Sequence, residues 1–273
     1  MKNKKTTAPI IEIFSSIQGE GLFIGERQIF VRFAGCNLKC SYCDTNWVAD
    51  ENTKNMTSDE MIDYIKNDLD FDFDLHKTLV FTGGEPLLQS DFIKECADKI
   101  HDDLQMNIIL ETNGTLPKNL LEVVDLIDIV STDFKFQKYL PSQSEFSSVI
   151  LSKAKDIDFS ARLRMTNDKN VLLSSQTQFL QILMENGKDF YVKLVCDEQL
   201  SFNEFAIAID EIHKIAEDAI IVIQPIMTDR KFSYFKKFDE FFKIALRKFR
   251  AKDSQVKGDV LLLPQIHKFL GIK

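Results

Sequence analysis

Short apolar stretches alternate along this chain with segments of helical periodicity, and this alternation restricts the fold more than any other feature. The stretches are rich in β-branched and aromatic residues and have the pattern of buried parallel strands; they are Gln28–Phe33, Thr78–Thr82, Asn107–Leu110, Leu126–Val130, Phe190–Cys196 and Ala219–Ile223. Because short connections between such strands favour right-handed βαβ units, we predict an α/β fold with a parallel sheet. Six strands predict a partial (β/α)6-type barrel with ligands at the carboxyl ends of the strands.

Three segments between these strands have the periodicity of amphipathic helices. Two of them begin at capping boxes, Thr57-Ser-Asp-Glu60 and Ser201-Phe-Asn-Glu204. Their apolar positions are Met61, Ile62, Ile65 and Leu69; Phe92, Ile93, Cys96, Ala97 and Ile100 after Ser90; and Phe205, Ala208, Ile209, Ile212 and Ile215. A phenylalanine-rich helix is expected over about Phe232–Phe249, and the stretch Gln137–Asn170 is less regular. We predict one domain, 1–273, with a core at about 11–230 and a C-terminal helix and tail, 231–273, that complete the site.

Composition and charge argue against several classes of protein. The net charge of −8 over 273 residues is unlike that of a general nucleic-acid binder, which needs a basic surface. No apolar run approaches the roughly 18 residues of a membrane span, and the basic start Met1–Thr7 lacks the apolar region of a signal peptide. Cys96 and Cys196 lie in helix- and strand-like patterns, so we expect them to be buried. Free thiols without an export signal predict a cytoplasmic protein that binds neither nucleic acid nor membrane.

Three of the five cysteines fall in one short segment, Cys36-Asn-Leu-Lys-Cys40-Ser-Tyr-Cys43. Thiolates suit zinc or iron–sulfur clusters, but a structural zinc site and a protein-held four-iron cluster both use four protein ligands. No further Cys or His follows until His76. We therefore predict a [4Fe–4S] cluster with three Cys ligands and one iron open to a non-protein ligand. A zinc knuckle that lacks a ligand and a coincidental group of cysteines are the alternatives.

Polar residues follow several of the predicted strands where each strand ends. Thr82-Gly83-Gly84-Glu85-Pro86 combines two glycines, which let backbone approach a ligand, with an anion suited to an amine. Glu111-Thr112-Asn113-Gly114 and Ser131-Thr132-Asp133-Phe134-Lys135 end the next two strands, and Gln224-Pro225 ends a later one. Each alone is compatible with an ordinary turn. Because the carboxyl ends of parallel strands meet at one edge, together they predict a ligand site there.

The cysteine segment, with Tyr42 before its last cysteine, and the Gly-Gly-Glu-Pro element resemble those of the radical S-adenosylmethionine (SAM) superfamily. The resemblance implies that the amino and carboxylate groups of SAM chelate the open iron. It also implies a SAM-binding set at the strand ends, namely Tyr42, Gly83, Gly84, Glu85, Thr112, Asn113, Ser131, Asp133, Lys135 and Gln224.

Further segments narrow the resemblance to one family. Glu12-Ile-Phe-Ser-Ser-Ile-Gln-Gly-Glu-Gly21, Arg32-Phe-Ala-Gly-Cys36, Cys40–Thr45 and the tail Leu262-Leu-Pro-Gln-Ile-His-Lys268 resemble the 7-carboxy-7-deazaguanine synthase family. The likeness runs from about residue 11 to 135 and resumes near Gln224 and at the C-terminus. One departure follows Lys135, where Phe-Gln-Lys-Tyr-Leu-Pro-Ser-Gln replaces the compact Pro-Ser-Ser-Gly of the family.

The resemblance implies a ring contraction. A 5′-deoxyadenosyl radical removes hydrogen from C6 of 6-carboxy-5,6,7,8-tetrahydropterin, the rearranged radical recovers that hydrogen, and ammonia leaves to give 7-carboxy-7-deazaguanine with SAM regenerated. The implied substrate-binding residues are Ile17, Gln18, Gly19, Glu20, Arg32, Thr82 and His267, and Glu111 is a candidate catalytic residue. Arg32 is suited to clamp the pterin carboxylate, the alternative being a surface ion pair. Thr45 matches a magnesium-contacting threonine of the family, and Asp44 is a candidate cap for the next turn.

The family resemblance further implies a flavodoxin- or ferredoxin-type electron donor and a homodimer. A second enzyme hypothesis is an activase that installs a glycyl radical on a protein partner, since such enzymes share the cluster and SAM elements. A third hypothesis, from a different class, is a zinc-binding interaction module. Iron and sulfide analysis of anaerobically purified protein separates the zinc module from the two radical enzymes.

Overall fold

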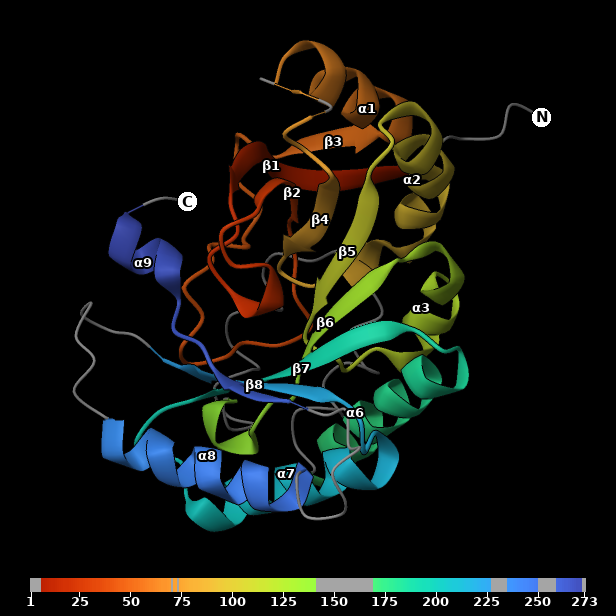
Figure 1. Ribbon diagram of the computed structural model, residues 1–273. Helices are drawn as coiled ribbons and strands as arrows, with labels where there is room; N and C mark the ends of the chain where they lie inside the picture. Colours follow the sequence, from red (N-terminus) through yellow and green to blue (C-terminus); the bar gives the residue numbers. More distant parts are fainter. Residues whose placement is uncertain are drawn as a thin grey trace.

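The computed structural model describes residues 6–69, 71–72, 74–140, 169–226, 235–249 and 259–271. The described strands form a single nine-stranded sheet in the order β3-β1-β2-β4-β5-β6-β7-β8-β9. Their bounds are β1 Thr7–Ile17, β2 Arg27–Phe33, β3 Lys54–Thr57, β4 Thr78–Gly83, β5 Asn107–Thr112, β6 Ile129–Asp133, β7 Asp189–Cys196, β8 Ile220–Pro225 and β9 Val260–Leu262. Figure 1 shows the sheet curving from β1 and β3 to β8 and β9.

The six predicted parallel strands are confirmed as β2 and β4–β8, which pair in parallel in chain order. The prediction for β6 is wrong in its bounds, because the strand begins at Ile129 rather than Leu126 and runs to Asp133. A 3-10 turn, Val124–Leu126, precedes it, and the Leu126 N–H donates to the Val123 carbonyl. Ser131 and Asp133 therefore belong to the strand instead of following it.

Three strands at the two ends of the sheet were not predicted. β1 pairs antiparallel with β2 and with β3, and β9 adds in parallel to β8. In the second half of β1, Glu12–Ile17, only Ile13 is buried, so this part lacks the continuous apolar pattern of the central strands. The antiparallel register brings Glu12 opposite Arg32. β1 thus carries the Glu12–Ile17 part of the family-like segment to the wall of the barrel.

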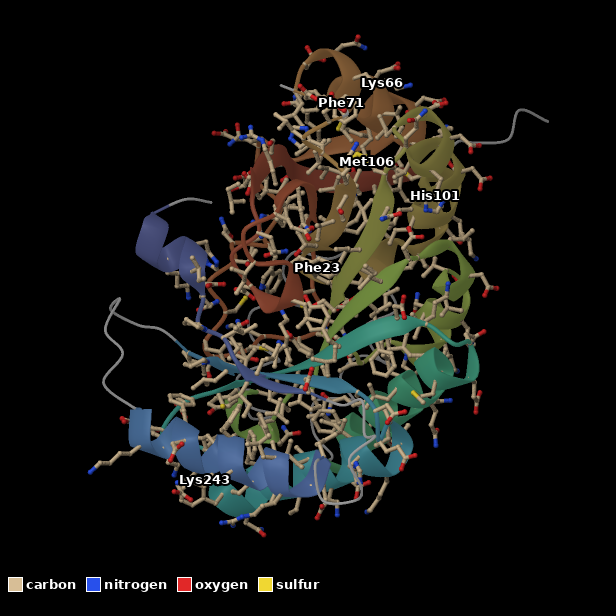
Figure 2. The ribbon with its side chains drawn as sticks, in the orientation of Figure 1. Phe23, Lys66, Phe71, His101, Met106 and Lys243 are labelled. Carbon is tan, nitrogen blue, oxygen red and sulfur yellow. The ribbon has the colours of Figure 1, made fainter. Side chains whose placement is uncertain are left out.

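The helices are α1 Ser58–Asn67, α2 Ser90–Asp103, α3 Pro117–Leu121, α6 Lys169–Glu185, α7 Phe202–Ile215, α8 Phe235–Phe249 and α9 Ile266–Leu270, with 3-10 turns at Gly21–Phe23, Pro86–Gln89 and Gln137–Tyr139. Figure 1 shows α1–α3 and α6–α8 along the outer side of the curved sheet and α9 on the opposite side. Lys66 of α1 and Lys243 of α8 lie on the outer side of these helices (Figure 2). Most of the irregular stretch, 141–168, and the start of the predicted phenylalanine-rich helix, before Phe235, lie outside the described residues.

Local sequence signals set the ends of these helices. Thr57 forms the full capping box with Glu60, as predicted. At α7 the Ser201 hydroxyl accepts from the Glu204 N–H and donates to the Glu204 carboxylate. Cys96 on α2 and Cys196 at the end of β7 are fully buried, which confirms their prediction as core residues. Among the described residues, no helix combines the length and apolarity that crossing a membrane requires.

Candidate active site

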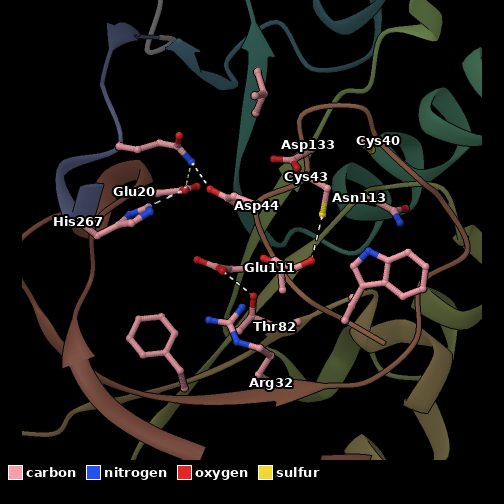
Figure 3. Close-up of a pocket in the computed structure, with 18 of the residues that line it drawn as sticks. Glu20, Arg32, Cys40, Cys43, Asp44, Thr82, Glu111, Asn113, Asp133 and His267 are labelled. Carbon is pink, nitrogen blue, oxygen red and sulfur yellow. Dashed lines mark hydrogen bonds and ion pairs between the residues drawn. The ribbon is translucent and has the colours of Figure 1, made fainter. Parts of the chain in front are cut away.

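A cavity of about 900 Å³ opens at the carboxyl ends of the parallel strands. All of the site residues predicted from sequence line it except Glu85 and Ser131; the lining set is Ile17, Gln18, Gly19, Glu20, Arg32, Cys36, Cys40, Tyr42, Cys43, Thr45, Thr82, Gly83, Gly84, Glu111, Thr112, Asn113, Asp133, Lys135, Gln224 and His267. Figure 3 shows Glu20 and His267 together at one side of the cavity and Cys43 and Asn113 at another. The topology thus brings the cysteine loop, the ends of β4, β5, β6 and β8 and the C-terminal tail to one cavity.

The cysteine loop follows β2, and Cys36, Cys40 and Cys43 all line the cavity. Within the described residues, no three His, Cys, Asp or Glu side chains form a site for a single metal ion. The three thiols are close enough for neighbouring pairs to interact electrostatically. Among the described residues no further His, Cys, Asp or Glu joins them as a metal ligand, so this soft donor set fits a cluster with one open iron better than a closed zinc site.

Gly84 explains how β4 can end against this loop. A Cβ at Gly84 would overlap the carbonyl oxygen of Gly35, so only glycine allows the approach. The Gly84 N–H donates to the Phe33 carbonyl at 3.1 Å, and the Glu85 N–H donates to the Gly35 carbonyl at 2.9 Å. The Gly-Gly pair therefore fixes the cysteine loop against the sheet and exposes backbone to the cavity.

Glu85 lies behind the cavity wall, contrary to the expectation that it presents an anion to a ligand amine. Its carboxylate is fully buried and accepts from the Leu87 N–H at 3.0 Å, the Thr112 hydroxyl at 2.8 Å and the Asn113 N–H at 2.8 Å. Burial raises the pKa of Glu85 to about 7. Glu85 thus holds Thr112 and Asn113, which do line the cavity. Ser131 is likewise buried and lies outside the lining.

Asn113 connects the end of β5 to the cysteine loop. Its side-chain amide donates to the Asn37 Oδ1 at 2.8 Å, and the Asn37 amide donates to the Thr115 hydroxyl, also at 2.8 Å. The Asn113 Oδ1 in turn accepts from the Thr115 N–H at 3.1 Å. These three side chains are buried. This set of bonds fixes the loop between Cys36 and Cys40, and the Asn113 amide also lies 3.9 Å from the Cys36 Sγ.

Lys135 connects the end of β6 to the same loop. Its Nζ donates to the Asp133 Oδ2 at 2.6 Å and to the Tyr42 hydroxyl at 3.0 Å. Burial lowers the pKa of Lys135, but Asp133 beside it outweighs burial and holds the pKa well above its ordinary value. Lys135, which directly precedes the segment that departs from the family pattern, therefore places a charged ammonium group beside Tyr42.

Glu20 is held by three donors from distant parts of the chain, which we name the Glu20 cluster. Its carboxylate accepts from Lys193 Nζ at 3.1 Å, Gln224 Nε2 at 3.0 Å and Gln265 Nε2 at 2.7 Å. The His267 Nδ1 lies 4.0 Å away. Burial raises the pKa of Glu20, but Lys193 and the two amides outweigh burial and lower the pKa to about 2. Glu20 is therefore an ionised acceptor across the physiological range.

The C-terminal tail closes one side of the cavity over the Gln18–Gly21 segment. The Ile266 N–H donates to the Gly19 carbonyl at 2.9 Å, and a Cβ at Gly19 would overlap His267. Lys268 Nζ forms an ion pair with the Asp44 Oδ2 at 2.7 Å, so Asp44 binds the tail rather than capping a turn. Gly19 is thus required by the close approach of α9.

Arg32 lies in the cavity wall on β2, paired with a residue of β1. Its Nε donates to the Glu12 Oε1 at 2.9 Å, and its guanidinium lies 5.4 Å from the Phe14 ring centre. Beside it, the Thr82 hydroxyl donates to the Glu111 Oε2 at 2.9 Å, and Gln18 Nε2 donates to the Glu111 Oε1 at 3.0 Å. The surface ion pair considered as the alternative role of Arg32 is present as its pair with Glu12. This pair lies in the cavity wall, where it orients the guanidinium.

Comparison with known proteins supports the same interpretation. A model of the radical SAM superfamily matches residues 30–135. The 7-carboxy-7-deazaguanine synthase of Methanothermobacter thermautotrophicus is 32% identical over 270 residues, which cover 97% of this chain and 98% of that protein. A protein of the same name from Geobacter sulfurreducens is 28% identical over 98% of both chains. The chain belongs to the 7-carboxy-7-deazaguanine synthase family.

Solved structures support the fold of this synthase family member. The crystal structure of QueE from Escherichia coli has a TM-score of 0.56 at 17% identity and covers 96% of this chain and 95% of that chain. Streptococcus suis SuiB bound to S-adenosylmethionine has a TM-score of 0.52 at 12% identity and covers 83% of this chain but 48% of that chain. At these identities the likeness concerns the fold alone.

Several residues of the synthase cavity were missed from sequence. Glu12, Trp47, Lys193, Gln265 and Lys268 all line it. Lys193 carried a usable signal, because it interrupts the apolar run Phe190–Cys196 and a charged residue in a buried strand needs a partner. Gln265 and Lys268 lie in the family-like tail, next to His267. The pairing of Glu12 with Arg32 depends on the register of β1, which the sequence pattern did not reveal.

The cysteine loop of the synthase gives a direct test. Cys36→Ala, Cys40→Ala and Cys43→Ala should each lose bound iron and sulfide, because a three-thiolate site has no spare ligand. Cys96→Ala and Cys196→Ala, both buried away from the cavity, are the matched controls and should retain wild-type iron and sulfide. Analysis of anaerobically reconstituted protein measures both sets. Iron loss in either control would contradict the three-ligand assignment.

The Glu20 cluster predicts a pH dependence of stability. Because the pKa of Glu20 in the folded protein is about 2, below the ordinary 4.5, its ionised form contributes stability above about pH 4.5 that is lost as the pH falls toward 2. Glu20→Gln removes this titration, so its unfolding free energy should fall less than that of wild type over this window. Urea denaturation at several pH values measures the difference. Glu51→Gln, at an exposed position, should follow wild type; a parallel fall in Glu20→Gln would contradict the prediction.

Proposed function

We propose that this protein is a radical SAM 7-carboxy-7-deazaguanine synthase, which converts 6-carboxy-5,6,7,8-tetrahydropterin to 7-carboxy-7-deazaguanine with loss of ammonia. The observation that carries the proposal is the single cavity lined by the three-cysteine loop, the guanidinium of Arg32 and the ionised Glu20. Full-length identity to synthases of this name supports the substrate assignment. The product is a precursor of queuosine and related deazapurines.

The cofactor side of the cavity belongs to the cysteine loop and the strand ends. Cys36, Cys40 and Cys43 would hold a [4Fe–4S] cluster, whose open iron would bind SAM and which would supply the radical chemistry for removing hydrogen from the substrate. Backbone of Gly83 and Gly84 lines the cavity beside this loop. The remaining polar residues on this side, which would bind SAM, are Tyr42, Thr112, Asn113, Asp133, Lys135 and Gln224.

Asp133 is the clearest acceptor for SAM. Its Oδ1 is buried and has no hydrogen-bond partner among the described residues, although Lys193 Nζ lies 3.5 Å away. Its Oδ2 is held by Lys135. An oxygen in this position is suited to accept from a hydroxyl of the SAM ribose, since a buried polar atom without a partner is costly.

On the substrate side, Arg32 binds the pterin carboxylate. A guanidinium presents paired N–H donors to a carboxylate, and its orientation is set in advance by Glu12. Gln18 and Glu20 face the pterin edge, where the ionised Glu20 accepts from N–H donors. Thr82 and Glu111 are hydrogen-bonded to each other and line the cavity next to Arg32. Glu111 is the candidate catalytic residue. His267 and the Ile17–Gly19 backbone close the site from the tail side.

Other parts of the proposal rest on the family alone. Magnesium would be bound by the oxygen of Thr45, which lines the cavity, together with the substrate and water. The protein would be a cytoplasmic homodimer of one domain, residues 1–273, reduced by a flavodoxin- or ferredoxin-type donor. The glycyl-radical activase is not favoured, because the tail closes the cavity and the relatives are named as synthases.

Anaerobic incubation of reconstituted protein with SAM, a reductant and 6-carboxy-5,6,7,8-tetrahydropterin tests this function. Mass analysis should show 7-carboxy-7-deazaguanine, with loss of ammonia and little net consumption of SAM. Absence of this product from protein with full cluster content and SAM binding would overturn the proposal. A radical on a protein partner instead would favour the activase.

Arg32→Lys tests the substrate pose, because it keeps the charge but loses the planar fork. We expect kcat/KM for the pterin to fall about 10- to 100-fold, the factor expected for one hydrogen bond between charged groups. SAM binding and iron content should stay near wild type, while 5′-deoxyadenosine released without product should increase. Arg27→Lys is the matched control, since Arg27 is on the same strand but donates to His76 away from the cavity. Equal losses in both variants would remove Arg32 from its assigned role.

A further inference from the structure

Lys193 is a charged residue in the centre of a buried strand. It lies on β7 between Val192 and Leu194, both fully buried, and its own side chain is 8% exposed. The side chain lines the cavity. Burying an ammonium group is unfavourable unless the charge is paired, so its partners should reveal why a lysine is present.

The Nζ of Lys193 lies between two carboxylates. It donates to the Glu20 Oε2 at 3.1 Å and lies 3.5 Å from the Asp133 Oδ1. Asp133 is also its register partner on β6. Burial lowers the pKa of Lys193, but Asp133 and Glu20, with a smaller contribution from Glu111, hold it well above its ordinary value. Lys193 therefore stays charged between the carboxyl groups of Glu20 and Asp133.

These two carboxylates have different further partners. Glu20 is bound by Gln265, next to His267 on the proposed pterin side, and by Gln224, which is also proposed to bind SAM. Asp133 is bound by Lys135, which contacts Tyr42 of the cysteine loop on the proposed SAM side. Lys193 is the described side chain that contacts both carboxylates.

We propose that Lys193 is a positioning residue for the ring contraction, whose ammonium group fixes the pterin-binding carboxylate Glu20 relative to the SAM-binding carboxylate Asp133. The proposal rests on the proposed function. Without the ammonium group, two partly buried carboxyl groups would share the space with no positive charge between them, so they would move apart or one would take up a proton. The reacting hydrogen of the pterin would then lie out of line with the adenosyl group, and the radical would be quenched without product.

A double-mutant cycle separates positioning through Glu20 from a general structural role. The variants are Lys193→Met, Glu20→Gln and both together, with the ratio of 5′-deoxyadenosine to deazaguanine product as the readout, alongside iron content and SAM affinity. In Lys193→Met this ratio should rise about 10- to 100-fold, the factor for one hydrogen bond to a charged group, with iron content near wild type. Since an uncharged Glu20 does not need the ammonium group, the double variant should have the same ratio as Glu20→Gln alone.

Lys188→Met is the matched control. Lys188 lies just before the same strand, and its Nζ donates to the Ile127 carbonyl outside the cavity lining. In this variant the ratio of 5′-deoxyadenosine to deazaguanine product should equal that of wild type. Lys193→Met alone leaves the Glu20 carboxylate without its ammonium partner and could fail to fold or to retain iron. In that case the ratio of 5′-deoxyadenosine to product is compared between the double variant and Glu20→Gln, neither of which contains an unpaired Glu20 carboxylate. A difference between these two ratios would show that Lys193 does not act through Glu20.

Two results would overturn the inference. In the first, the effects of Lys193→Met and Glu20→Gln add in the double variant, which would show that Lys193 does not act through Glu20. In the second, product and 5′-deoxyadenosine fall together in Lys193→Met, in proportion to iron content, which would show a structural role only. Failure of the proposed function is a separate outcome, since it requires that the wild-type protein makes no deazaguanine from the pterin.

Discussion

A partly buried, ionised carboxylate, that of Glu20, connects distant segments around the cavity of this protein. Glu20 sits in a loop near the start of the chain, and its donors come from β7, β8 and the C-terminal tail. Desolvating a carboxylate is costly, and the three donors compensate for that cost. Glu20 thereby connects the loop after β1 to β7, β8 and the tail, which is also held by the Lys268–Asp44 ion pair and by the Gly19 carbonyl. The same charge gives the cavity an acceptor on its proposed pterin side.

Close approach of backbone provides the second constraint. At Gly84 the sheet meets the cysteine loop, and at Gly19 the tail meets the loop that carries Glu20. In both places a methyl group would overlap neighbouring atoms. The glycines of the Gly-Gly-Glu-Pro and Gln-Gly-Glu-Gly elements are therefore explained by packing of one part of the site on another, in addition to any contact with a ligand.

The sequence predicted the central architecture well because buried parallel strands leave a simple pattern of apolar runs ending in polar residues. The strand ends Thr82, Thr112 and Asp133 were placed correctly at the cavity for this reason. β1, which lies between β3 and β2, was missed because eight of its eleven residues are exposed or only partly buried. Periodicity also does not show where a side chain finds its partner. Glu85 was expected to face a ligand, yet nearby N–H and hydroxyl donors hold it behind the wall.

The central claim is that one cavity holds SAM and the pterin with their reacting atoms adjacent. Incubation with pterin carrying deuterium at C6, followed by mass analysis of recovered SAM, tests it most directly. If the adenosyl group takes the hydrogen from C6 and the product radical recovers a hydrogen from the same methyl group, deuterium should remain in part of the SAM, because the three hydrogens of that methyl group are equivalent. Unlabelled SAM after many turnovers to deazaguanine would contradict the account, since the hydrogen would then have been removed by a group other than the adenosyl radical.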